Sequence, residues 1–289
     1  MVGCGVAFPK GEPTVWQGFK VSVVIPALNE AESLPYVMPL IPEQVDEVIV
    51  VDGASTDGTI EVAKSLRPDV RIVFQESRGK GAALRAGFEA ATGDIVVHLD
   101  ADGSTDPREI PAFVETLLAG ADYAKGTRFG RGGMSDDITP LRRLGNWSFV
   151  AIANVLYGSA FTDITYGYNA VWRRHHTLLA PEINGWAHEI IANIRAHRRG
   201  LKVVEVASIE APRVAGEAKL QTFSAGWTIL KAIVGERFRP LPQVGAAAVA
   251  AHARPAAVAV ERSIEAPAPA LVAVPIVKES TPSARPSRG

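Results

Sequence analysis

The sequence Asp94-Ile-Val-Val-His-Leu-Asp-Ala-Asp-Gly-Ser104 joins an apolar run to two carboxylates. The run predicts a β-strand that ends by Gly103. On a strand, Asp100 and Asp102 share a face, with Cα atoms roughly 7 Å apart. Carboxylates about 5 Å apart repel by roughly 3 kcal/mol at an effective dielectric near 20. A hard cation such as Mg²⁺ or Mn²⁺ would remove this repulsion, and an acidic turn after a strand is the alternative.

Strand and helix signals alternate from about residue 20 to residue 238. The pattern predicts an α/β fold with a mostly parallel sheet and helices on both faces. The expected strands are 21–26, 47–52, 71–75, 95–100, 123–126 and 201–206. The expected helices are 31–40, 59–66, 81–91 and 107–118, the last capped by Asp106. In such sheets ligands bind beyond the carboxyl ends of the strands, so we expect the motifs that follow the strands to meet at one rim.

Composition divides the 289 residues into three parts. We predict an N-terminal extension (1–19), one large folded domain (20–238) and a flexible Ala/Pro-rich tail (239–289). The net charge of −1 excludes a general attraction to nucleic acid, and the single cysteine, Cys4, excludes a disulfide framework. No stretch reaches the roughly 18 apolar residues of a membrane span. We therefore expect a cytoplasmic protein, with peripheral contact to a membrane as a further option.

Three strand-end motifs in the first half offer polar groups to a ligand. Asn29 and Glu30 either cap the next helix or contact a nucleotide. Asp52 ends an apolar strand without an evident capping role, so its carboxylate is a candidate for a base or ribose contact. Gly79 and Lys80 lie in a Gly-rich turn that could meet an anion, although the spacing differs from a Walker A loop.

The second half supplies candidate acids and bases. Asp163 is either a turn residue or a functional carboxylate in a polar loop. Glu189 lies on an expected helix with Ile190, Ile194 and Trp186 facing inward, and is either solvent-exposed or functional. On that helix His188 and His197 are expected at the surface rather than as ligands.

Two further segments could meet a phosphate or a membrane. Arg213 and Lys219 flank a glycine in a loop and form either a phosphate clamp or a solvated basic loop. Phe223, Trp227, Leu230 and Val234 form a helical stripe. We expect the stripe to pack on the domain, with membrane contact as the alternative.

Taken together, the motifs resemble family-2 glycosyltransferases with a GT-A fold, in particular polyprenyl- and dolichyl-phosphate mannosyl- and glucosyltransferases. The resemblance covers about residues 20–238. The motifs that carry it are IPALNE, VDGASTDGT, RGKGAALRAG, DADGS, GTRF, RRLGN, FTDITYGYNAVWRR and PRVAGEAKL. The last four narrow it to the polyprenyl-phosphate branch.

The resemblance implies specific roles. Nucleotide-pocket residues would be Pro26, Leu28, Asn29, Glu30 and Asp52, with Gly79 and Lys80 beside them. Asp100, Ala101 and Asp102 would form the metal-binding aspartate motif that meets the donor diphosphate. Phosphates of donor and acceptor would bind Arg128, Arg142 or Arg143, Arg213 and Lys219; among these, Arg128 and Arg143 are assigned to catalysis. The chain departs from the family pattern where Val51 and Ala54 flank Asp52-Gly53, and where Ser104 replaces a frequent third ligand, glutamine.

The implied activity is inverting transfer of a hexose from a GDP- or UDP-sugar, with polyprenyl phosphate as the leading acceptor. Such an acceptor is already anionic at pH 7 and needs no strong base. Transfer to a soluble sugar or natural-product hydroxyl is the alternative, and would need Asp163 or Glu189 as base. A nucleotide-binding module without turnover is a further alternative. Pro26-Ala-Leu-Asn29 after the first strand argues against a nucleotidyltransferase.

Overall fold

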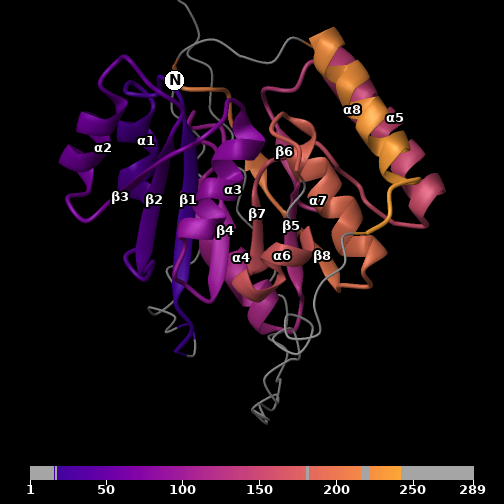
Figure 1. Cartoon of the computed structure of the whole chain (residues 1–289), viewed down its shortest axis with the longest axis horizontal. Coiled ribbons are helices and arrows are strands. Elements are labelled where there is room, and N and C mark those ends of the chain that lie inside the picture. The colour runs from indigo at the N-terminus through magenta and orange to yellow at the C-terminus, as the bar shows by residue number, and fades with distance from the viewer. Residues whose placement is uncertain (1–15, 17, 180–181, 216–221, 242–289) are drawn as a thin grey trace, which may run out of the picture. The chain divides into compact units, whose positions relative to one another are not determined.

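The computed structural model describes residues 16, 18–179, 182–215 and 222–241, and its centre is a seven-stranded sheet (Figure 1). The strand order is β3-β2-β1-β4-β7-β5-β8. The strands are β1 (Val21–Ala27), β2 (Glu47–Asp52), β3 (Arg71–Phe74), β4 (Ile95–His98), β5 (Tyr123–Thr127), β7 (Asn169–Trp172) and β8 (Val203–Ala207). A second, two-stranded sheet pairs β6 (Met134–Ser135) with β9 (Ile209–Glu210). The predicted α/β class with a mostly parallel sheet is confirmed.

Parallel pairing of β1 with β2 and β4 places the carboxyl ends of these strands at one edge. The register runs from Ser22 opposite Glu47 to Ala27 opposite Asp52, and Val24 lies opposite His98 on the other side. Only β7 runs against its neighbours β4 and β5. Its direction was not predicted, because antiparallel insertion is decided by long-range pairing rather than by the local sequence.

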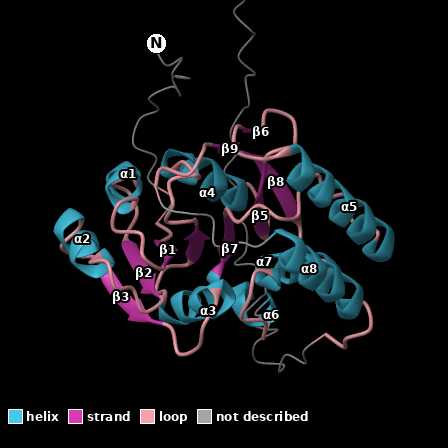
Figure 2. Ribbon diagram, turned by 90° about the horizontal axis from the view of Figure 1, so that it is seen from above, coloured by secondary structure: helices cyan, strands magenta, loops and turns pink. Residues whose placement is uncertain are grey.

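Helices cover both faces of the sheet (Figure 2). They are α1 (Leu34–Val37), α2 (Thr59–Leu66), α3 (Lys80–Ala90), α4 (Ile110–Leu118), α5 (Pro140–Tyr157), α6 (His176–Leu179), α7 (Ala187–Arg198) and α8 (Thr222–Glu236). Successive side chains of β1 point to opposite faces of the sheet, so the strand contributes to a core on each face. Val23 packs in the core with Phe113 of α4, and Val24 packs in the other core with Phe88 of α3.

Two of the predicted helices are shorter than expected. The segment 31–40 forms only α1 and a 3-10 turn at Met38–Leu40, because Pro35 and Pro39 each occupy an early position of a separate short helix. The segment 107–118 starts with a 3-10 turn before α4, and Asp106 caps it as predicted by accepting a hydrogen bond from the Arg108 amide. The predicted extension and tail lie almost wholly outside the described residues and stay predictions.

A third core joins α5, α7 and α8 beside the sheet. Ile190 and Ile194 of α7 pack there with Ile229 and Ile233 of α8. The inward stripe predicted for α8 is therefore wrong, since Trp227 and Val234 are exposed; the side chain of Phe223 lies outside the described residues. The helix buries its smaller and β-branched residues and turns its tryptophan outward.

A buried ion pair fastens α8 to α7. Arg195 Nε lies 2.8 Å from Glu236 Oε1, and Arg198 Nη1 lies 3.4 Å from the same oxygen. Glu236 is fully buried. Because a buried charge that loses its partner keeps its desolvation penalty, this pair should matter more than a surface pair.

We expect Glu236→Gln to lower the free energy of unfolding by about 3 kcal/mol, because Arg195 would lose its anionic partner in the interior. Urea denaturation followed by circular dichroism measures this. Asp69→Asn breaks the more exposed pair with Arg67 and serves as the matched control, with an expected change below about 1 kcal/mol. Equal losses in the two variants would contradict the fastening role.

Candidate active site

A cavity of about 840 Å³ opens at the carboxyl ends of β1, β2 and β4. Its wall runs from the β1 and β2 ends, past the aspartate pair, to helices α5 and α8. Predicted site residues on this wall are Pro26, Leu28, Glu30, Gly79, Lys80, Asp100, Ala101, Asp102, Arg128, Arg142, Glu189 and Arg213. The convergence expected at one rim is thus present among the described residues.

Asp100 and Asp102 both reach this cavity, and each is paired with a cation. Lys80 Nζ lies 2.5 Å from Asp100 Oδ1, and Arg213 Nη2 lies 2.8 Å from Asp102 Oδ2. Ser104 donates its amide and its hydroxyl to Asp102 Oδ1, at 2.9 and 2.7 Å. Burial raises the pKa of Asp100 to about 6, although Lys80 favours its charged form. The pair is an oxygen-only donor set, as a hard cation prefers.

The glycines on either side of Lys80 fix the position of its backbone. Gly79 has φ +114°, and a Cβ there would lie 2.2 Å from the Asn184 carbonyl oxygen. A Cβ at Gly81 would meet the Ile183 carbonyl oxygen at the same distance, while the Gly81 amide donates to the Asn184 carbonyl at 2.8 Å. The glycines that suggested an anion-binding turn therefore let α3 begin directly against the segment that precedes α7.

Glu189 is buried and lies on the other side of Lys80. Its Oε2 is 3.2 Å from Lys80 Nζ, and its Oε1 is 3.3 Å from His98 Nε2. Burial opposes the charge of Glu189, but Lys80 and His98 outweigh it and lower the pKa of the carboxyl to about 2. The solvent-exposed alternative for Glu189 is excluded.

The neighbours of Glu189 also differ from expectation. His188 is buried rather than at the surface, and burial lowers its pKa to about 4. Trp186 is not inward but lines the cavity, with Lys80 Nζ 5.8 Å from its ring centre. Trp186 precedes α7, which begins at Ala187, and His188 is buried because α7 is buried all round from Ala187 to Ala196.

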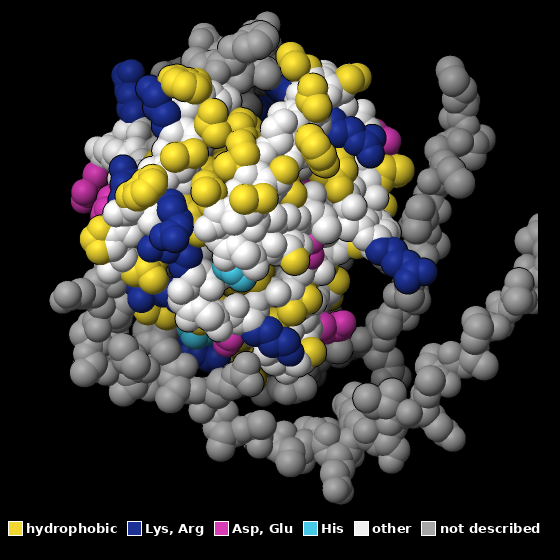
Figure 3. Space-filling model, turned by 90° about the vertical axis from the view of Figure 1, so that its right-hand side faces the viewer, with side chains coloured by type: hydrophobic (Ala, Val, Ile, Leu, Met, Phe, Trp, Pro, Cys, Tyr) yellow, Lys and Arg dark blue, Asp and Glu magenta, His cyan; other side chains and the backbone are white. Residues whose placement is uncertain are grey.

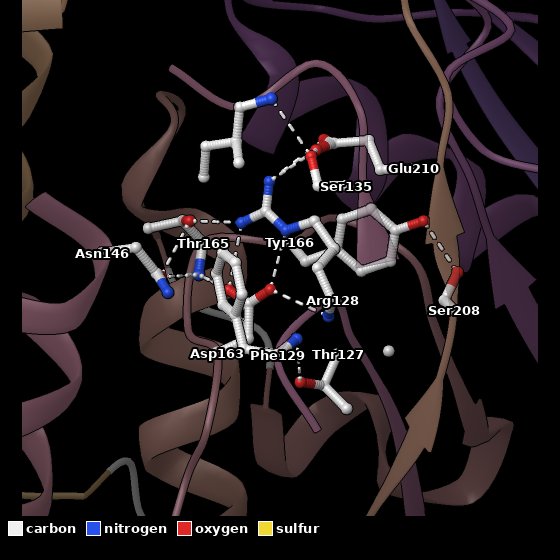
Figure 4. Close-up of polar contacts among 12 residues, drawn as sticks. Thr127, Arg128, Phe129, Ser135, Asn146, Asp163, Thr165, Tyr166, Ser208 and Glu210 are labelled. Carbon is white, nitrogen blue, oxygen red and sulfur yellow. Dashed lines mark hydrogen bonds and ion pairs between the residues drawn. The ribbon is translucent and has the colours of Figure 1, made fainter. Parts of the chain in front are cut away.

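Arg128 is the centre of a saturated network (Figure 4). Its Nε donates to Asp163 Oδ2 at 2.7 Å, Nη1 to Glu210 at 3.0 Å, and Nη2 to the Thr165 hydroxyl at 2.9 Å. Asn146 accepts from the amides of Ile164 and Thr165, at 3.2 and 3.3 Å, and so anchors the same loop.

Asp163 is a buried partner of Arg128. Its side chain is fully buried and does not line the cavity, and both its oxygens accept from Arg128. Burial opposes its charge, but Lys125 and Arg128 lower the pKa of the carboxyl below its usual range. The structure therefore does not bring Asp163 to the cavity, where a base for an acceptor hydroxyl would have to lie.

Arg142 and Arg143 separate on α5. Arg142 lines the cavity, whereas Arg143 is exposed and lies against the Phe129 ring, 5.3 Å from its centre. The helix phase is set by Thr139, which caps α5 by accepting from the Arg142 amide. Of the two predicted arginines the structure therefore brings Arg142, and not Arg143, to the cavity, and its role stays a prediction.

Two polar residues near the nucleotide end have local roles that the sequence did not reveal. Asn29, at φ +51°, accepts from the Thr56 amide at 2.8 Å and does not cap α1, whose N-cap is Ser33. Asp52 stabilises the turn after β2, because its Oδ2 accepts from the amides of Ala54 and Ser55, at 2.9 and 3.1 Å. Neither lines the cavity, so both support the two loops that do.

The loop that carries Arg213 docks on the aspartate motif. The Val214 amide donates to the Asp102 carbonyl, and the Ala211 amide to the Ser104 carbonyl, at 3.0 and 2.9 Å. Arg213 also pairs with Glu30, 3.3 Å away. Lys219, the other half of the predicted clamp, lies outside the described residues.

Several wall residues carried no usable signal in the sequence. Glu210, Asn146 and Gly167 belong to this group. A Cβ on Gly167 would lie 2.8 Å from Lys80 Nζ and 2.7 Å from Glu189 Oε1, so this glycine leaves room for the ion cluster. Asn146 belongs to the motif RRLGN and Gly167 to the motif FTDITYGYNAVWRR, so membership of these motifs was the only local indication for two of the three residues.

Comparison with known proteins connects this geometry to a family. The sequence profile described as glycosyl transferase family 2 matches residues 22–177. The undecaprenyl-phosphate mannosyltransferase of Micrococcus luteus is 33% identical over 215 residues, covering 70% of this chain and 87% of the relative. The polyprenol monophosphomannose synthase of Mycolicibacterium smegmatis is 34% identical over 212 residues, covering 68% and 80%.

The fold also matches a solved enzyme. Glucosyl-3-phosphoglycerate synthase from Mycobacterium tuberculosis, in complex with Mn²⁺, UDP and glucosyl-3-phosphoglycerate, superposes with a TM-score of 0.61 at 28% identity. The match covers 79% of this chain and 83% of the synthase. The same synthase has also been solved with Mg²⁺ and UDP.

Proposed function

The chain belongs to glycosyl transferase family 2, and from this we propose that it moves a hexose from a nucleotide-diphospho sugar to polyprenyl phosphate, with inversion at the anomeric carbon. One observation carries the choice of acceptor. The cavity that contains the aspartate pair continues into an apolar section between α5 and α8. A water-soluble acceptor gains nothing from contact with apolar side chains, whereas an isoprenoid chain is stabilised by burial against them.

We assign the donor to the end of the cavity at β1 and β2. Pro26, Leu28, Gly53 and Gln75 line it beside the aspartate pair. In an α/β sheet this is the edge where nucleotides bind. The nucleotide would lie there with its diphosphate toward Asp100 and Asp102.

The residues fit a divalent cation. Among the described residues, six acidic and four basic side chains line the cavity, which leaves an excess of negative charge. Asp100 and Asp102 would hold Mg²⁺ or Mn²⁺, which when bound supplies electrostatic stabilisation of the departing diphosphate. No group of three or more His, Cys, Asp and Glu side chains suited to a metal occurs in the described part of the chain, so the donor phosphates would complete the coordination.

The protonation states favour a phosphate acceptor over a hydroxyl. A general base works best when its pKa is near the working pH. Glu189, with a pKa lowered to about 2, and the fully buried Asp163 are both poor bases. A lipid phosphate needs none, because its second pKa near 6 leaves it anionic at pH 7.

Arg142 is our candidate for binding the acceptor phosphate. It lies in the first turn of α5 and lines the cavity that holds both the aspartate pair and the apolar section. Arg128 already donates to Asp163, Glu210 and Thr165, so its part is to shape the wall and add positive charge. Arg128 and Arg142 are given different roles because a guanidinium has only five N–H groups, and those of Arg128 already have partners within the chain.

The apolar section lies beside an exposed apolar face. Trp147 on α5 and Trp227 on α8 are 67% and 59% exposed, and Phe238 is 82% exposed. Figure 3 shows hydrophobic side chains gathered on this side of the molecule, with Lys and Arg side chains among them. Apolar groups among basic ones are typical of surfaces that lie on anionic membranes. No helix in the described ranges is long and apolar enough to cross a membrane.

We expect Asp102→Asn to reduce transfer at least about 1000-fold without unfolding the protein, because the donor diphosphate loses its electrostatic stabilisation. The assay uses UDP- and GDP-hexoses with Mg²⁺ or Mn²⁺, with or without EDTA and a short polyprenyl phosphate. Asp69→Asn is the control for loss of one carboxylate. Transfer only to a soluble hydroxyl or to phosphoglycerate would refute the lipid acceptor, and full activity of Asp102→Asn would refute the metal assignment.

Gly145→Leu should block the lipid and spare the donor. A Cβ at Gly145 meets nothing within 4 Å, and the residue lines the apolar section, so the leucine would fill the cavity without a clash. Transfer to polyprenyl phosphate should fall at least about tenfold while hydrolysis of the donor is unchanged. Gly235→Leu, equally unobstructed but away from the cavity, is the matched control. The proposal fails if both variants retain full transfer.

Vesicle sedimentation tests the membrane contact. Trp147→Ser with Trp227→Ser should weaken binding to vesicles of anionic phospholipid at least about tenfold, because two aromatic side chains would no longer enter the interface. Phe74→Ser removes an equally exposed aromatic residue from β3, on another part of the surface, and should change binding less than about twofold. Loss of binding in both variants alike, or in neither, speaks against the α5–α8 face.

A further inference from the structure

The aspartate pair is already neutralised by two cations of the chain itself. Asp100 is bound by Lys80 and Asp102 by Arg213, at 2.5 and 2.8 Å. These cations come from segments more than 100 residues apart, the start of α3 and the loop after β9. Each occupies a carboxylate oxygen that a divalent cation would need.

Each of these cations also has a second anionic partner that retains it at the site. Lys80 is bound on its far side by Glu189, which His98 in turn contacts. Arg213 is bound by Glu30. A cation that leaves its aspartate therefore stays at the cavity wall rather than moving to solvent.

We propose that Lys80 and Arg213 are exchangeable internal counter-ions, which release Asp100 and Asp102 to the divalent cation when a nucleoside diphosphate gives them a new anionic partner. The inference rests on the proposed function for the identity of the cation and the diphosphate. A cation alone must displace both side chains without giving them a new partner. A cation together with a diphosphate supplies that partner, so the two ligands bind cooperatively, with the same coupling seen from either one.

The surroundings of Lys80 place its ammonium group at the cavity wall. The group lies next to Gly167, where a Cβ would be 2.8 Å from it, and 5.8 Å from the centre of the Trp186 ring. The Lys80 side chain is 11% exposed and lines the cavity, so a phosphate that enters the cavity meets the ammonium group directly.

Mn²⁺ binding without nucleotide gives the most direct test. Electron paramagnetic resonance of free Mn²⁺ measures its affinity for the wild type, Lys80→Met and Arg213→Met. We expect about tenfold tighter binding in each variant, because one competing cation is gone. Lys64→Met removes an exposed lysine from α2 and should leave the affinity unchanged. Arg213→Lys keeps the charge and should restore the weak binding of the wild type.

Calorimetry with UDP and GDP in EDTA gives the complementary readout. Both Met variants should bind the nucleotide about tenfold more weakly without metal, and the gain on adding Mn²⁺ should shrink compared with the wild type. Arg213 lies in a surface loop, so its variant keeps the test valid if Lys80→Met fails to fold.

The outcomes separate this inference from the proposed function. Unchanged or weaker Mn²⁺ binding in the folded Met variants would overturn the counter-ion exchange, even if transfer to polyprenyl phosphate is observed. Tighter binding would uphold it, even if the acceptor proves to be soluble. Absence of Mn²⁺ binding in every variant would overturn both the exchange and the metal assignment.

Discussion

Repulsion between Asp100 and Asp102 is the constraint around which this site is organised. The two carboxylates come from one short segment after β4, and their charges are balanced from elsewhere in the chain. Lys80 comes with the first turn of α3, and Arg213 with a loop that docks on the backbone of residues 102–104. The electrostatic balance of the site therefore also fixes the relative positions of three segments that are distant in sequence.

The two ends of the cavity are built by different means. The donor end follows from parallel strands whose carboxyl ends meet at one edge, so that the segments after these strands line the same cavity. The acceptor end lies beyond the sheet and depends on α5 and α8, which pack on α7 rather than on strands. Donor binding therefore depends on the sheet, whereas acceptor binding depends on the packing of α5 and α8.

Prediction from the sequence succeeded where local chemistry decides the structure. The strand β2 and the helix α2 have the expected bounds, and the aspartate pair lies at the expected rim. It failed where a partner distant in the chain decides. Arg142 and Arg143 can be told apart only once the Thr139 cap fixes the phase of α5, and the role of Asp163 only once Arg128 is beside it. The buried face of α8 was mistaken because large side chains were expected inside, although the helix packs through Ala225, Ile229 and Ile233.

The ion pair between Arg195 and Glu236 anchors α8 at its last residue, which does not line the cavity. Ala225 and Ile229 are buried in the core and also line the cavity, whereas Trp227 and Leu230 line it with greater exposure. Substitutions at Trp227 and Leu230 leave the ion pair at the end of the helix untouched. The helix can therefore diversify during evolution, or be redesigned, to accept a different lipid while the donor chemistry of the sheet is inherited unchanged.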